Sequence, residues 1–142
     1  MTARLLVVLQ FAAIATVLSP AGRVGALRTG VMISLAGVAW VGWTVRFNRW
    51  GNFNIRPEPR SGARLITEGP YRRVRHPMYL GSLVIGFGAC VAGPQVWRFA
   101  AWAVLAGVLI AKARREERGL LKQFPGYESY RRSRAFLIPG LW

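Results

Sequence analysis

The chain is at once apolar and strongly basic. Its 142 residues are 53% hydrophobic with a mean hydropathy of +0.27, yet the formal net charge is +15. The length suits one domain. The single cysteine, Cys90, excludes an intrachain disulfide, and one histidine with no aspartate leaves too few ligands for us to expect a metal site. We interpret Cys90 as a small buried side chain rather than a reactive thiol.

The first apolar segment covers residues 5–18 and is interrupted only by Gln10 and Thr16. A Ser-Pro-Ala-Gly turn follows at residues 19–22, and Arg4 precedes the segment. This pattern suits either a short first membrane helix or a signal peptide. We favour the helix because a second apolar segment follows directly after the turn.

The second apolar segment covers residues 29–47, has no charge before Arg46 and reaches the length needed to span a membrane. Trp40 and Trp43 lie near its end and Trp50 lies just beyond it. Tryptophans at that position are typical of the aromatic belt at a membrane interface.

A polar stretch, residues 48–75, which we expect to form a loop or a short interfacial helix, separates the two apolar halves. The third apolar segment, residues 77–93, begins with Pro77, which suits a first helical turn because its missing N–H costs nothing there. Small residues recur along this segment, which indicates close contact with another helix. These residues are Gly81, Gly86, Gly88, Ala89 and Ala92.

The fourth apolar segment, residues 96–111, has no charge after Arg98 and continues as a polar helix to about Gln123. Phe-Pro-Gly at residues 124–126 ends it, and a basic, aromatic tail follows. The sequence therefore predicts an all-α integral membrane bundle of about four transmembrane helices in two helical hairpins. A cytoplasmic C-terminal helix and tail complete the predicted fold.

The basic residues are strongly segregated between the two sides of such a bundle. Seventeen of the twenty Lys and Arg residues fall on the side of both termini, and only Arg23, Arg28 and Arg98 fall on the other. The positive-inside rule then predicts that both termini are cytoplasmic, in the inner membrane if the cell is bacterial. A nucleic-acid binder would not need its charges divided by four apolar runs, so we expect no nucleic-acid partner.

Two polar clusters share the predicted cytoplasmic side, at residues 69–79 and 112–117. His76 stands before the helix that starts at Pro77, where free backbone N–H groups favour an acceptor. Taken alone, His76 is a capping or interfacial histidine.

Glu116 and Glu117 lie in a run of basic residues. One interpretation is surface pairing, such as Lys112 with Glu116 at i,i+4. The other is a carboxylate that receives a cationic or hydroxyl-rich ligand, and composition leaves both open.

Together these residues form a pattern that covers residues 52–139 and resembles the isoprenylcysteine carboxyl methyltransferase family. The related phospholipid N-methyltransferases share much of it. The matching elements are Gly69-Pro70-Tyr71, Arg75-His76-Pro77-x-Tyr79-x-Gly81, Glu116-Glu117-Arg118-x-Leu120 and a Phe-x-Gly-Tyr-x-x-Tyr run from Phe124 to Tyr130.

The resemblance implies an integral-membrane methyltransferase that uses S-adenosylmethionine. Its single domain, residues 1–142, would comprise an N-terminal helical hairpin, 1–47, and a cofactor-binding core, 48–142. The cofactor pocket would be lined by Leu65, Ile66, Tyr71, His76, Pro77, Met78, Tyr79 and Glu116. Lys112 falls where the family has a substrate-side catalytic arginine, and it keeps the charge but lacks the planar fork of arginine.

Methyl transfer from a sulfonium is an in-line displacement that depends mainly on positioning and requires no metal. We therefore assign His76 to cofactor binding in preference to base catalysis. The first expectation is carboxyl O-methylation of a prenylcysteine-like or other lipophilic acid, and the alternative is N-methylation of a phospholipid or small amine. The expected partners are a lipophilic small-molecule or lipid substrate and membrane lipids. A non-catalytic membrane scaffold is the alternative from another class.

Overall fold

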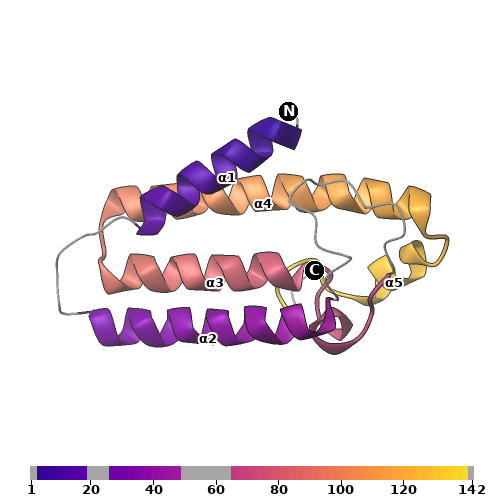
Figure 1. Cartoon of the computed structure of the whole chain (residues 1–142), viewed down its shortest axis with the longest axis horizontal. Helices are drawn as coiled ribbons and strands as arrows, with labels where there is room; N and C mark the ends of the chain where they lie inside the picture. Colours follow the sequence, from indigo (N-terminus) through magenta and orange to yellow (C-terminus); the bar gives the residue numbers. More distant parts are fainter. Residues whose placement is uncertain (1–2, 19–25, 49–64, 141–142) are drawn as a thin grey trace.

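The computed structural model describes residues 3–18, 26–48 and 65–140, most of which form helices (Figure 1). The elements are α1 (Ala3–Leu18), α2 (Leu27–Phe47), the 3-10 helix η2 (Gly69–Arg72), α3 (Pro77–Ala92), α4 (Val96–Gln123) and α5 (Tyr127–Ser133). These bounds confirm the helical prediction for the four apolar segments and the extension of the fourth to Gln123. The turn predicted at 19–22, Trp50 and most of the polar stretch lie outside the described residues.

Helices α2 and α3 pack together through small residues, as the sequence predicted. A Cβ atom added to Gly88 would lie 2.5 Å from the carbonyl oxygen of Gly30 and 2.4 Å from Oγ of Ser34. The Ser34 hydroxyl donates a hydrogen bond of 3.1 Å to the carbonyl oxygen of Ile85. The two backbones therefore approach more closely than larger side chains would allow.

The first hairpin is not the packed pair that we predicted. Helix α1 packs mainly on α4, where Ala13 contacts Leu105 and Leu109, while α2 packs on α3. Figure 1 shows the resulting order of neighbours, α2, α3, α4 and α1. The small residues of α3 face those of α2, and this close seam leaves α1 to cover the apolar face of α4.

Arg98 is buried, not a loop charge as its place in a tight turn suggested. Its guanidinium donates to the carbonyl oxygens of Val17, Ala89 and Gly93 at 2.6–3.0 Å. These carbonyls belong to the last turns of α1 and α3, where a cation is favoured and carbonyls lack helical partners. Cys90 is fully buried beside Arg98, which confirms its interpretation as a small buried residue.

Two helices, Leu27–Phe47 and Val96–Gln123, are long and apolar enough to cross a membrane, whereas α1 and α3 are shorter apolar helices of 16 residues each. Only 17% of the apolar window of α2 and 33% of that of α4 is buried, whereas the core helix of a soluble protein is mostly buried. Four membrane crossings therefore remain a prediction. The apolar part of α4 ends at Ala111, and its charged remainder, which starts at Lys112, continues to Gln123.

One end of the bundle gathers most of the polar elements. Figure 1 shows that the end of α2, the start of α3, the end of α4 and α5 all lie there. The tail returns to this end, where Ala135 forms an isolated parallel bridge with Val74 and accepts a 2.9 Å hydrogen bond from the backbone N–H of Arg75.

Candidate functional site

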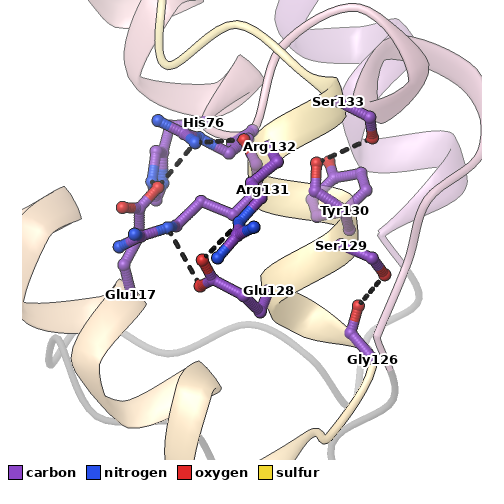
Figure 2. Close-up of polar contacts among 10 residues, drawn as sticks. His76, Glu117, Gly126, Glu128, Ser129, Tyr130, Arg131, Arg132 and Ser133 are labelled. Carbon is purple, nitrogen blue, oxygen red and sulfur yellow. Dashed lines mark hydrogen bonds and ion pairs between the residues drawn. The ribbon is translucent and has the colours of Figure 1, made fainter.

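His76 occupies the N-cap position of α3, directly before Pro77, but its side chain makes no capping bond. The imidazole instead points at α4, where Nε2 lies 3.2 Å from Oε1 of Glu117 (Figure 2). Its Nδ1 atom lies 3.7 Å from Oε2 of Glu116. His76 is only 6% exposed, so both carboxylates meet it away from bulk water. The expected capping role thus gives way to a contact between two helices.

Tyr79 lies one turn into α3 and completes this contact. Its hydroxyl donates to Oε1 of Glu116 at 2.5 Å, and its ring stacks on His76 with centroids 5.6 Å apart and planes 12° apart. Because α3 and α4 lie side by side, the first turn of one helix faces the end of the apolar part of the other.

Lys112 is buried one helical turn before Glu116 on α4. Its Nζ atom lies 5.6 Å from the centre of the Tyr79 ring and donates a 2.7 Å hydrogen bond to Oε1 of Gln10. Helix α1 thereby contributes a residue to the cluster, although the sequence assigned the cofactor core to residues 48–142.

Arg75 and the tail enclose the other side of His76. The Nε atom of Arg75 lies 3.0 Å from Oε1 of Glu117, and its guanidinium carbon lies 5.3 Å from the centre of the Phe136 ring. Phe136 also meets the His76 ring edge to face, with centroids 5.1 Å apart. A further bond from Arg75 to the carbonyl oxygen of Arg131 ties α5 to this loop.

The loop before α3 is held in place by contacts with α2 and with α5. Gly69 has φ +56°, and a Cβ there would lie 2.6 Å from the ring of Phe47, so no larger residue fits this turn. The Tyr130 hydroxyl donates a 2.8 Å hydrogen bond to the carbonyl oxygen of Tyr71. The Gly-Pro-Tyr sequence is therefore fixed between the end of α2 and helix α5.

The pKa values of the two carboxylates are shifted in opposite directions. Burial raises the pKa of Glu116, and the lowering effects of His76, Tyr79 and Lys112 offset only part of this rise. Burial also acts upward on Glu117, but its hydrogen bond to His76 and the charges of His76 and Arg75 outweigh it and lower its pKa. Two neighbouring carboxylates with opposite shifts are typical of sites where each has a distinct role.

The structure brings together four of the residues selected from the sequence, namely His76, Tyr79, Glu116 and Lys112. Tyr71 also lies within electrostatic reach of Glu116. Burial raises the pKa of the Tyr71 hydroxyl, and the charges of Tyr130 and Glu116 add to this rise.

The remaining selected residues take no part in the polar contacts of this cluster. Pro77 is buried, and its carbonyl oxygen accepts a 2.9 Å hydrogen bond from the Trp40 indole. Met78 is half-buried in the first turn of α3, and Leu65 and Ile66 are half-buried in the segment before η2.

Sequence reasoning did not select Glu117, Arg75, Phe136 or Gln10 as site residues. Glu117 and Arg75 stand inside the recognised motifs, and Gln10 is one of two polar residues in an apolar run, so each carried some signal. Phe136 carried none, because it reaches the site through the bridge between the tail and Val74.

The cluster has the chemistry to hold a cation that also bears hydroxyl groups. Aromatic rings at His76, Tyr79 and Phe136 offer faces and edges to a cation. The Glu116 side chain is 23% exposed, so a ligand can reach its carboxylate. Among the described residues, no group of three His, Cys, Asp or Glu side chains is arranged to hold a metal ion.

Comparison with known proteins gave one match. A family model described as phospholipid methyltransferase matches residues 26–126, which is well over half of the chain. The matched range runs from α2 to the end of α4 and includes His76, Tyr79, Lys112 and Glu116. Searches of curated proteins and of solved structures gave no match.

Proposed function

The chain belongs to the phospholipid methyltransferase family, and on that premise we propose that it is an S-adenosylmethionine-dependent methyltransferase acting on a phospholipid amine in the membrane. The observation that carries this proposal is the contact of His76 and Tyr79 with Glu116, between the start of α3 and the charged part of α4. It unites the two motifs of the sequence, which are 37 residues apart.

Glu116 is the proposed anchor of the cofactor. Its carboxylate can accept hydrogen bonds from ribose hydroxyls or from the ammonium group, and the Tyr79 hydroxyl holds it in position. The rings of His76 and Tyr79 would contact the sulfonium, and Tyr71, Pro77, Met78, Leu65 and Ile66 would complete the walls. When bound, S-adenosylmethionine supplies an already activated methyl group.

The protein's own contribution is positioning and the exclusion of water. His76 is almost fully buried between α3, α4 and the tail, so the cluster presents fixed groups rather than mobile side chains. A fixed geometry between donor and acceptor can lower the barrier by several kcal/mol, on the order of 7 or more in the best cases. A protonated amine acceptor must lose a proton before its nitrogen lone pair can attack the methyl group, whereas an ionised carboxylate acceptor needs no base.

Carboxyl O-methylation is the second candidate, and Lys112 is the observation that favours it. Its Nζ atom lies at the Tyr79 ring beside Glu116, where it can attract an acidic substrate. The phospholipid acceptor comes first because it agrees with the family description. A methyl ester releases its label as volatile methanol in base, whereas an N-methyl group is stable, so base treatment of the labelled product separates the two.

Calorimetry on the purified protein in detergent tests the cofactor site. We expect S-adenosylmethionine to bind and Glu116→Gln to weaken binding about tenfold, because a charged hydrogen-bond acceptor is lost. Glu68→Gln is the matched control, since Glu68 is exposed before η2 and its side chain makes no capping bond. Absence of binding to the unaltered protein at millimolar ligand overturns the proposal.

A further inference from the structure

A cavity of about 900 Å³ opens beside the cluster, between the loop before α3, the end of α4 and the tail. Seven of the twelve lining residues that the structure describes are arginines. The loop and η2 supply Arg72, Arg73 and Arg75, and α4 supplies Arg114. Helix α5 and the tail supply Arg131, Arg132 and Arg134. Three separate segments of the chain therefore place positively charged side chains around one cavity.

The arginines are poorly balanced by carboxylates. Among the described lining residues, Glu117 is the one acidic side chain, and it pairs with Arg75. Arg131 and Arg132 share Glu128, at 3.3 and 2.9 Å (Figure 2). For the other four arginines, the described part of the chain provides no ion pair with a carboxylate. Like charges gathered in a hollow repel one another unless an anion joins them.

The cavity lies at the level where we expect the membrane to begin. Arg114 lies two residues beyond Lys112, the first charged residue after the apolar segment 96–111 of α4, and Arg75 stands two residues before the start of α3. Lipid phosphates occupy this level, and basic residues next to a membrane helix attract them. The cavity also shares Glu117 and Phe136 with the candidate site, so an anion bound here lies next to the proposed methyl-transfer cluster.

We propose that this arginine-lined cavity is a phosphate-binding subsite that holds the phosphate of the methyl acceptor. As an acceptor subsite it rests on the proposed function. A carboxylate uses one or two guanidinium forks, whereas a phosphate presents more oxygens and accepts bidentate bonds from several directions. Four arginines on three segments, for which the described residues supply no acidic partner, suit the larger anion. The volume is also within the range of small-ligand sites.

The test measures binding without S-adenosylmethionine, so its result is independent of the cofactor site. The full chain in detergent is titrated with short-chain phosphatidylethanolamine, with inorganic phosphate and with a diacylglycerol that lacks phosphate. Arg114→Gln and Arg134→Gln each remove one lining charge. Lys122→Gln removes one exposed charge from the same helix as Arg114 but outside the cavity.

We expect Arg114→Gln and Arg134→Gln each to weaken binding of the phosphate-bearing probe about tenfold, while Lys122→Gln changes it less than twofold. Arginine-dependent binding of the phospholipid assigns the subsite to a headgroup, and the same dependence with inorganic phosphate alone assigns it to a free phosphate.

Equal weakening by all three variants, or equal binding of diacylglycerol, overturns the inference. Cofactor binding by calorimetry on the same preparations separates this failure from a failure of the proposed function.

Discussion

Glu116 and Glu117 are neighbours in the sequence, yet their side chains reach different surroundings. Glu116 receives the Tyr79 hydroxyl and remains partly accessible, and burial raises its pKa. Glu117 is closed in between Arg75 and His76, and its hydrogen bond to His76 and its ion pair with Arg75 lower its pKa despite its burial. This division indicates that Glu116 is available to a ligand, whereas Glu117 orients His76 and Arg75.

Replacing Glu117 should therefore affect stability more than ligand contact. Glu117→Gln leaves Arg75 and His76 without their carboxylate, and we expect a loss of about 2 kcal/mol near pH 7, since charged hydrogen bonds contribute roughly 1.5–3 kcal/mol. Thermal unfolding in detergent measures this loss. Glu128→Gln is the control, because its ion pairs on α5 are more exposed and such pairs contribute about 1 kcal/mol or less.

The same variant carries a pH signature. A carboxyl group whose folded pKa is lowered stabilises the fold above its unfolded pKa, and this contribution is lost as pH falls through the folded pKa. The unaltered protein should therefore melt at a higher temperature than Glu117→Gln, and this difference should be largest near pH 7. The difference should disappear as the pH falls below the ordinary glutamate pKa of about 4.3. A gap that widens in acid contradicts the assignment of Glu117 as the buried charged partner.

At the scale of elements, the seam between α2 and α3 sets how the site is supported. Gly30 and Gly88 bring the two backbones together, and Trp40 of α2 donates to the carbonyl oxygen of Pro77 at the first turn of α3. The start of α3, which carries His76 and Tyr79, is therefore positioned by α2 as well as by α4.

A methyl group placed in this seam should weaken it. A Cβ at Gly30 would lie 2.3 Å from the backbone nitrogen of Ala92, so Gly30→Ala must push the helices apart, at a cost of roughly 1–3 kcal/mol. Gly42→Ala is the matched control on the same helix, since nothing lies within 4 Å of its Cβ position. Melting in detergent compares the two, and equal melting temperatures would show that the seam does not stabilise the bundle.

Helix positions could be predicted from local signals, but the pairing of helices could not. Pro77 marked the start of α3, and the Phe-Pro-Gly run at 124–126 marked the end of α4. The contact of Gln10 with Lys112 joins residues 102 positions apart, and no periodic pattern encodes such a distance. The docking of Ala135 beside Val74 likewise depends on the whole bundle being in place.

At the scale of the whole molecule, apolar helices carry a charged site at one end (Figure 1). The resemblance seen in the sequence is confirmed at the level of the integral-membrane methyltransferase group that includes the phospholipid methyltransferases. The segregated arginines and lysines also predict a direction for the chain in the membrane. Most of them lie on the side of this end, which the positive-inside rule places in the cytoplasm.

This direction gives a prediction of topology. In a Cys90→Ala background, Lys122→Cys at the end of α4 should react with an impermeant thiol reagent only from the cytoplasmic face. Gln95→Cys, in the turn between α3 and α4, should react only from the opposite face, because the apolar part of α4 separates the two. The reversed pattern of labelling in sealed vesicles would refute the predicted orientation.

The central claim is that the cluster of His76, Tyr79 and Glu116 supports methyl transfer to a phospholipid amine. The most direct measurement supplies the reconstituted protein with phosphatidylethanolamine and S-adenosylmethionine carrying a labelled methyl group. We expect base-stable label in the lipid fraction and a rate at least tenfold lower for Glu116→Gln, with Glu68→Gln unchanged. A lipid fraction without base-stable label, or label that is independent of Glu116, would contradict the claim.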